Sequence, residues 1–204
     1  MRFGRTKLTE VISSISGRIE VWDEGDERKL TIEGATQSIA RQRGDRRGYW
    51  ERLVPEEELT SVLILGLGGG TIARWILEDW PRTKVVAYEL DPEVVRVARQ
   101  FMELPDEVEV RIRDFHEGVT ADEQYDLVIV DLYSGYQFLP EAESEETLTR
   151  IRNRLKPGGR AAFNRVGVLV GPGGLSEFED RLRRIFREVS VEKVNLNRIF
   201  WGKT

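Results

Sequence analysis

The stretch SVLILGLGGGT, residues 61–71, decides the fold of this chain. It begins with an apolar run of the length of a buried strand, continues through Gly66, Gly68 and Gly70, and leads into residues with helical spacing. A glycine-rich turn between a strand and a helix lets backbone N–H groups approach a ligand at the positive end of the helix dipole. Glycine also serves tight turns that need a positive φ, so the cluster by itself leaves a purely structural role open.

Short apolar segments alternate with helical patterns after this turn, as they do in a buried parallel sheet. The predicted strands are 62–65, 84–89, 108–112, 127–130 and 160–163, and the predicted helices are 71–79, 92–101, 144–155 and 174–186. Pro92 suits the first turn of its helix, with Asp91 as the cap before it. Two last segments, 189–194 and 198–201, predict a hairpin. The sequence therefore predicts an α/β fold with a Rossmann-like, mostly parallel sheet and an antiparallel C-terminal hairpin.

The residues before the turn follow a different pattern. Polar and apolar residues alternate over 18–22 and 29–32, on either side of a polar turn, which predicts a β-hairpin. Residues 34–48 predict a strand end and then a loop, which is made basic by Arg41, Arg43, Arg46 and Arg47. Because Pro55 and the glutamates after it mark a boundary, we expect an N-terminal β region at 1–55 and a Rossmann-like domain at 56–204.

Composition limits the partners and the location of the protein. The 204 residues, 40% of them hydrophobic, are enough for one substantial core. Asp and Glu outnumber Lys and Arg by 36 to 31, so there is no general footprint for nucleic acid. With no cysteine and a single histidine, His116, we expect no metal site and no catalytic role for that histidine. The lack of cysteine and of any long apolar run favours a cytoplasmic protein with no membrane partner.

The residues around the glycine turn indicate which nucleotide it would hold. Glu89 ends the next predicted strand, about 20 residues further on, where a carboxylate accepts hydrogen bonds from ribose hydroxyls. Thr71 stands where a dinucleotide fingerprint needs Gly or Ala, and no lysine follows to grip a phosphate. A ligand with an adenosine group and no phosphate, such as a sulfonium nucleoside, fits this pattern best.

Two further carboxylates follow predicted strands at the same edge of the sheet. Asp114 comes with Phe115, and an acceptor beside an aromatic face suits adenine; alternatively, Asp114 only caps a helix. Asp131 closes the most apolar strand and would lie in the crevice where open α/β sheets bind ligands. There it could orient a nucleophile and accept its proton, unless it only bonds local backbone.

Taken together, these motifs resemble the spermidine synthase (polyamine aminopropyltransferase) family over nearly the whole chain. The matching segments are Gly34-Ala35-Thr36-Gln37-Ser38, Tyr49-Trp50-Glu51, Tyr88-Glu89-Leu90-Asp91-Pro92, residues 125–131 and Leu155-Lys156-Pro157-Gly158-Gly159. The resemblance implies a seven-stranded sheet of the S-adenosylmethionine-methyltransferase type in a nucleotide-binding catalytic domain. It also implies a homodimer or tetramer, without a metal.

The resemblance assigns roles to several residues. It implies that Glu89 binds the ribose and Asp114 the adenine, that Gln37 and Tyr49 line the active site, and that Asp131 is the base. The co-substrate would be decarboxylated S-adenosylmethionine or S-adenosylmethionine itself, and an aminopropyl or alkyl group would pass to an amine or another small acceptor.

The chain also departs from the family pattern. Gly69 stands where the family usually has an aspartate that holds the aminopropyl ammonium, and Ser134 replaces a second acidic residue after Asp131. The arginines of 41–47 would bring positive charge to the entrance if the loop folds inward; the alternative is a solvated loop. Two other functions therefore stay open: an S-adenosylmethionine-dependent methyltransferase on a small molecule, and a non-catalytic relative that binds a nucleoside.

Overall fold

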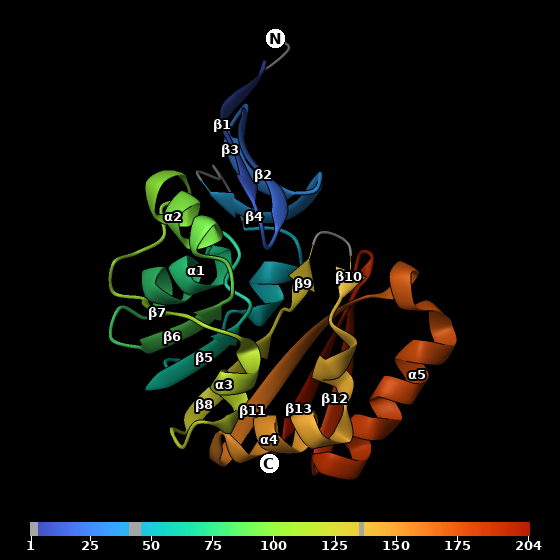
Figure 1. The fold of residues 1–204 in the computed structure, drawn as a ribbon. Coiled ribbons are helices and arrows are strands. Elements are labelled where there is room, and N and C mark those ends of the chain that lie inside the picture. Colours follow the sequence, from blue (N-terminus) through green and yellow to red (C-terminus); the bar gives the residue numbers. More distant parts are fainter. Residues whose placement is uncertain (1–3, 41–45, 135–136) are drawn as a thin grey trace.

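The computed structural model in Figure 1 describes residues 4–40, 46–134 and 137–204. Its first part is an antiparallel sheet with the strand order β1-β2-β3-β4. The strands are β1 (Arg5–Ser13), β2 (Gly17–Glu24), β3 (Glu27–Ile32) and β4 (Ala35–Ala40). The predicted hairpin is the β2-β3 pair. A strand end was predicted from residue 34, where β4 lies, and β1 was not predicted. Strand β1 was missed because most of its side chains are partly or fully exposed and carry little hydrophobic signal.

The second sheet has seven strands in the order β12-β13-β11-β8-β5-β6-β7. They are β5 (Ser61–Leu65), β6 (Lys84–Glu89), β7 (Glu109–Ile112), β8 (Tyr125–Val130), β11 (Leu155–Val166), β12 (Glu188–Val194) and β13 (Asn197–Lys203). The strands from β11 to β7 are parallel, while β13 pairs antiparallel with both β11 and β12. The predicted fold class, with its antiparallel C-terminal hairpin, is thereby confirmed.

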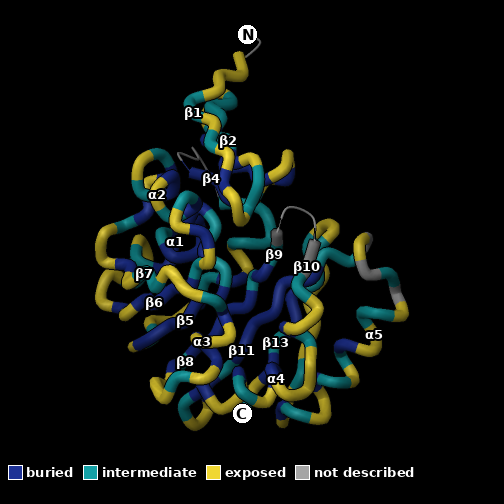
Figure 2. The backbone as a smooth tube through the Cα atoms, in the orientation of Figure 1, coloured by how far each residue is buried: buried dark blue, intermediate teal, exposed yellow. Residues whose placement is uncertain are grey.

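Helices cover both faces of this sheet. They are α1 (Thr71–Asp79), α2 (Pro92–Phe101), α3 (Phe115–Thr120), α4 (Glu145–Asn153) and α5 (Gly167–Ile185), with short 3-10 helices η1 (Tyr49–Leu53) and η2 (Pro140–Glu143). Helices α1 and α2 pack with η1 against one face, and α3, α4 and α5 pack against the other. Asp91 caps α2 as predicted, since its carboxylate accepts from the Glu93 N–H over 2.8 Å. Figure 2 shows the resulting core as buried backbone along β5, β8 and β11.

The largest differences from the predictions are two elements that begin early and one pair of strands that was not predicted. Strand β11 begins at Leu155, well before the predicted 160, because its first residue already pairs with Tyr125 ahead of an irregular stretch. Helix α5 begins at Gly167 and is interrupted at Gly171, whose φ of 75° is not helical, so its first part lacked a continuous helical pattern. The short pair β9 (Tyr133–Ser134) and β10 (Gln137–Phe138) was not predicted and follows Asp131 directly.

The four-stranded sheet packs on the larger domain next to the glycine turn, as Figure 1 shows. Its apolar face, which includes Ile19 and Leu30, lies against Val94 and Val97 of α2. Strand β4 is held to the start of α1, because the Thr71 hydroxyl accepts from the Ile39 N–H (2.8 Å) and donates to the Ile39 carbonyl (2.9 Å). The N-terminal sheet therefore supplies one wall of the region above the carboxyl ends of β5 and β6.

Candidate active site

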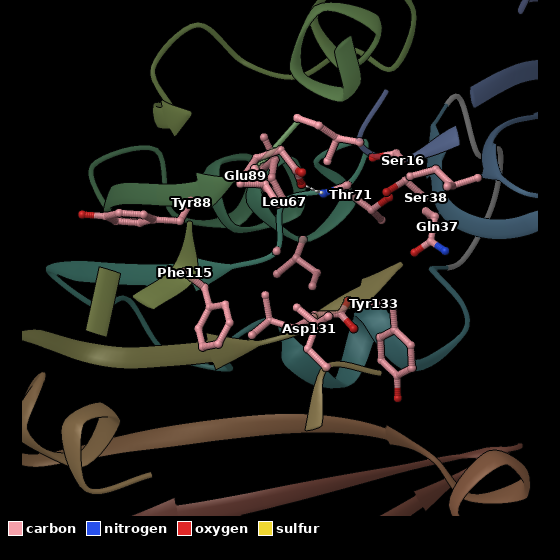
Figure 3. Close-up of a pocket in the computed structure, with 18 of the residues that line it drawn as sticks. Ser16, Gln37, Ser38, Leu67, Thr71, Tyr88, Glu89, Phe115, Asp131 and Tyr133 are labelled. Carbon is pink, nitrogen blue, oxygen red and sulfur yellow. Dashed lines mark hydrogen bonds between the residues drawn. The ribbon is translucent and has the colours of Figure 1, made fainter. Parts of the chain in front are cut away.

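A cavity of about 240 Å³ lies where the carboxyl ends of the central strands meet the N-terminal sheet. Seven of the nine predicted site residues line it: Gln37, Gly66, Gly68, Glu89, Asp114, Phe115 and Asp131. In Figure 3, Glu89 lies on one side of the cavity, Asp131 and Tyr133 lie on the opposite side, and Gln37 and Ser38 close a third side. The other two predicted residues, Gly70 and Tyr49, are absent from the lining but lie directly behind it, as N-cap of α1 and as partner of Asp131.

The glycine turn needs its glycines for two separate reasons. Gly66 has a φ of 90°, and a side chain there would place a Cβ 2.3 Å from the Asp131 carbonyl oxygen, so this residue allows β5 and β8 to end side by side. Gly68 has a φ of 53° and lines the cavity, and its N–H donates to Oε2 of Glu89 over 3.2 Å. Both glycines have a positive φ and both line the cavity, and Gly66 is in addition the point of close approach to β8.

Glu89 is held in place from both sides by backbone. Its Oε2 accepts from Gly68 and its Oε1 accepts from the Asp91 N–H over 3.1 Å. Burial raises the pKa of Glu89, although these backbone donors oppose that rise. Each oxygen keeps a lone pair for a further donor, so the carboxylate can accept from two hydroxyl groups of a ligand in the cavity.

Ser38 fills the place beside Gly69. Its hydroxyl accepts from the Gly69 N–H over 2.7 Å, and a Cβ at position 69 would lie 2.7 Å from the Ser38 Cβ. An aspartate, which the family resemblance would lead one to expect at position 69, does not fit here unless Ser38 moves. Ser38 was not among the predicted site residues, although it directly follows Gln37 in one of the matching segments.

Asp131 lies at the end of β8 with both carboxylate oxygens engaged. Oδ2 accepts from the Tyr49 hydroxyl over 2.9 Å, and Oδ1 accepts from Nδ2 of Asn164 over 2.8 Å. Burial raises the pKa of Asp131 to about 6, against the effect of these two hydrogen bonds. Burial and the neighbouring charge of Asp131 hold the pKa of Tyr49 well above its usual 10, so Tyr49 is a neutral donor at physiological pH.

A second layer of polar groups holds Asn164. Nδ2 of Asn197, at the start of β13, donates to Oδ1 of Asn164 over 2.7 Å. The Tyr133 hydroxyl accepts from the Val166 N–H (2.8 Å) and donates to the Asn164 carbonyl (3.3 Å). Asn197 thus holds the Asn164 amide, and Asn164 and Tyr49 donate to Asp131. No motif in the sequence marked Asn164 or Asn197. Asn164 lies near the end of β11, the neighbour of β8, and Asn197 begins β13, the next strand along.

Asp114 is a helix cap, and together with Phe115 it also lies at the cavity. Asp114 caps α3, since its Oδ1 accepts from the His116 N–H over 2.8 Å and contacts the His116 ring Nδ1 at 2.7 Å. Phe115 is buried, and its ring centroid lies 4.0 Å from that of His116. Both residues also line the cavity, at the strand end next to Glu89.

The described part of the basic loop does not enter the cavity. Arg46 forms ion pairs with Glu78 (2.9 Å) and Asp79 of α1, and Arg47 pairs with Glu27. This agrees with a solvated loop for these two arginines; Arg41 and Arg43 lie outside the described residues. The side chain of Ser134 is likewise outside the described part of the chain.

Two features are absent from the described residues. No group of three potential His, Asp or Glu ligands gathers within 4–40, 46–134 and 137–204. In the same part of the chain, no helix has the length and apolar character to cross a bilayer.

The sheet order and the glycine turn define a class I methyltransferase-like protein, and comparison with known proteins agrees. A family model described as a methyltransferase domain matches residues 62–159, just under half of the chain. The solved structure of human methyltransferase-like protein 13 in complex with SAH superposes with a TM-score of 0.63 at 24% identity, over 76% of this chain and 75% of that one.

Two solved structures share the fold over nearly the whole chain, with the N-terminal sheet included. A spermidine synthase in complex with the transition-state analogue AdoDATO matches with a TM-score of 0.80 and 18% identity, over 97% of this chain and 73% of that one. The spermidine synthase from Thermotoga maritima matches with a TM-score of 0.77 and 19% identity, over 97% of this chain and 72% of that one.

Curated relatives point the same way. The polyamine aminopropyltransferase of Chromobacterium violaceum is 28% identical over 191 residues, which cover 85% of this chain and 70% of that protein. The probable polyamine aminopropyl transferase of Bifidobacterium longum is 28% identical over 132 residues, 64% of this chain and 30% of that protein. The chain thus spans less than a third of the Bifidobacterium protein and just over two thirds of the Chromobacterium protein. It is a spermidine-synthase-like protein with a class I methyltransferase-like fold.

Proposed function

We propose that this protein is a transferase of the spermidine synthase type. It binds S-adenosylmethionine or its decarboxylated form in the cavity and transfers an aminopropyl or related alkyl group to an amine. The observation that carries the proposal is Asp131, a half-buried carboxylate with a pKa of about 6 that shares one cavity with Glu89 and the glycine turn. The names of the curated relatives support the same activity.

The nucleoside of the donor would lie along the ends of β5, β6 and β7. Glu89 would accept from the ribose hydroxyls, and the Gly66–Gly70 turn would approach the donor with its backbone. Asp114 and Phe115 would offer an acceptor and an aromatic face to adenine, while Gln37 would close the site from the N-terminal sheet. This placement brings the sulfonium toward Asp131.

The proposed reaction is a displacement at the carbon next to the sulfonium. The acceptor amine must be neutral to attack, and Asp131 would orient it and accept its proton, which then passes to solvent. The nitrogen lone pair forms the new C–N bond as the C–S bond breaks, and that electron pair leaves with sulfur as a neutral thioether. Tyr49 and Asn164 would hold the carboxylate in line while one lone pair faces the amine.

A second function is favoured by one observation. The contact of Ser38 with Gly69 leaves this part of the cavity without the carboxylate that would hold an aminopropyl ammonium. An intact methionine tail, whose own carboxylate balances its ammonium, needs no such partner. The protein would then be an S-adenosylmethionine-dependent methyltransferase acting on a small amine.

Calorimetry and product analysis separate these functions. The purified protein is titrated with S-adenosylmethionine, its decarboxylated form, methylthioadenosine and NAD, and turnover products are identified by mass spectrometry. Methylthioadenosine as product supports aminopropyl transfer, and S-adenosylhomocysteine supports methyl transfer. Binding of NAD alone would refute both. A cytoplasmic location and a homodimer or tetramer belong to the same proposal, and light scattering of the purified chain tests the oligomer.

A further inference from the structure

We infer that the acceptor is a primary amine with a single amino group and an apolar or aromatic body, and that diamines are poor acceptors. The inference rests on the proposed function, since it concerns the molecule that receives the transferred group. It is carried by the side chains around Asp131 and by the positions of the other carboxylates.

The wall of the cavity around Asp131 is aromatic and apolar. Trp50, Tyr133 and Leu139 line the cavity with Asp131, and the ring centroids of Trp50 and Tyr49 are 4.6 Å apart. Tyr133 lies close enough for the charge of Asp131 to raise the pKa of its phenol, together with burial. One carboxylate among aromatic rings suits one amino group, and the rings offer contact area to an apolar body.

Among the residues that the structure describes, the other acidic side chains that line the cavity are Glu89 and Asp114, and both lie on the donor side. The sheet order is β8-β5-β6-β7, and Asp131 follows β8. Glu89 ends β6, two strands from β8, so its backbone is about 10 Å from that of Asp131. Asp114 follows β7, three strands from β8, at about 14 Å. In the proposed complex the remaining lone pairs of Glu89 accept from the ribose hydroxyls, and Asp114 caps α3. In the proposed complex the nucleoside occupies this side, so neither residue is within reach of an acceptor's far end.

Between Asp131 and Pro140 the sequence holds no acidic residue that could partner a second ammonium. Residues 134–138 are Ser-Gly-Tyr-Gln-Phe, so this segment contributes no carboxylate wherever it lies. Glu143 is near enough to Tyr133 for its charge to act on that phenol. It already forms ion pairs with Arg165 and with Arg181, the latter at 2.8 Å. Arg165 is itself buried at the end of β11. A second ammonium would therefore lose its water without gaining a carboxylate, which is unfavourable.

Matched pairs of amines test the inference with the full chain. Release of the thioether nucleoside is followed by chromatography with whichever donor binds, using butylamine against 1,4-diaminobutane and 2-phenylethylamine against both. We expect kcat/KM to be at least tenfold higher for the monoamines. Equal or better turnover of the diamine would overturn the inference and leave the proposed function intact. No turnover with any amine, although the donor binds, would refute the proposed function and this inference with it.

A carboxylate added to the apolar wall gives a second test. Leu139→Asp should raise kcat/KM for 1,4-diaminobutane relative to butylamine by at least tenfold. Ile12→Asp is the matched control, because Ile12 is 69% exposed on β1 and outside the cavity lining, and the same ratio should not change there. Thermal unfolding and donor affinity establish that both variants fold. A folded Leu139→Asp protein that binds donor with an unchanged ratio would contradict the inference.

Discussion

The Tyr49 hydroxyl donates to Oδ2 of Asp131 over 2.9 Å, although 82 positions separate the two residues in the chain. This bond joins η1, which follows the N-terminal sheet, to the end of β8 at the centre of the large sheet. The proposed base is therefore oriented by a segment that comes before the glycine turn. Its geometry depends on how the N-terminal residues dock, as well as on the nucleotide-binding domain.

Substitution of Asp131 by asparagine should abolish transfer without loss of donor binding. The amide cannot accept the proton of the attacking amine, so kcat should fall by ~10² or more. Donor affinity, measured by calorimetry, should stay within about twofold because Glu89 and the glycine turn are unchanged.

Asp126→Asn is the matched control at the other end of the same strand. Burial opposes ionisation there, but Thr60, Lys156 and Ser61 lower the pKa of Asp126 to about 2. A depressed pKa stabilises the fold above the unfolded pKa of about 3.9, and this stability is lost as pH falls toward 2. Asp126→Asn should therefore reduce stability at pH 7 by about 1–2 kcal/mol and leave kcat unchanged. Full activity in Asp131→Asn would exclude this residue as base.

The rate of transfer should depend on pH through Asp131. Its pKa of about 6 means that the carboxylate is ionised at pH 7 and protonated at pH 5, so kcat should fall tenfold per pH unit below 6. Tyr49→Phe removes a hydrogen bond that lowers this pKa, and the acidic limb should move to higher pH. Stopped-flow or steady-state rates between pH 4.5 and 8.5 would show the limb, and an identical limb in both proteins would contradict the assignment.

Asn197 should act on Asp131 through Asn164. Asn197→Ala removes the donor to Oδ1 of Asn164, which frees that amide to turn away from the carboxylate. We expect kcat to fall and the acidic limb to shift upward, with donor affinity unchanged, because Asn197 is outside the cavity lining. Asn197→Ser keeps a donor and should recover part of the shift. A lower melting temperature with an unshifted pH profile would indicate a purely structural role.

The sequence was sufficient for the class of fold and for most of the cavity. Apolar strands, glycines at the turn and carboxylates at strand ends are local signals, and Gly68, Glu89 and Asp131 lie together at one cavity as expected. The exposed strand β1 has no such signal. Contacts between distant segments could not be predicted from the sequence either. Ser38 meets Gly69 only because β4 packs on the glycine turn.

Glu89 should carry much of the affinity for the donor. Glu89→Ala removes the acceptor for the ribose hydroxyls and also leaves the Gly68 and Asp91 N–H groups without their partner. We expect the affinity for donor and for methylthioadenosine to fall at least tenfold, which corresponds to about 1.4 kcal/mol. Glu93→Ala, on the exposed side of α2, is the control and should bind normally. Unchanged calorimetric affinity in Glu89→Ala would remove this residue from the site.

Restoring an aspartate at position 69 should require a second change at Ser38. In Gly69→Asp the new Cβ meets the Ser38 Cβ at 2.7 Å and Met102 at 3.2 Å, so we expect a loss of about 1–3 kcal/mol from overpacking. The melting temperature should fall by about 2–4 °C for each kcal/mol in a domain of this size.

The double variant Gly69→Asp, Ser38→Gly removes the Ser38 side chain and should regain most of this stability, leaving only the adjustable contact with Met102. With a carboxylate now in the cavity, its affinity for decarboxylated S-adenosylmethionine should rise relative to S-adenosylmethionine, because only the decarboxylated tail carries an uncompensated ammonium. Ser38→Gly alone is the control for the ratio of the two affinities. If Gly69→Asp melts at the wild-type temperature, Ser38 does not block the position; if the double variant folds with an unchanged ratio, the donor's tail does not lie beside residue 69.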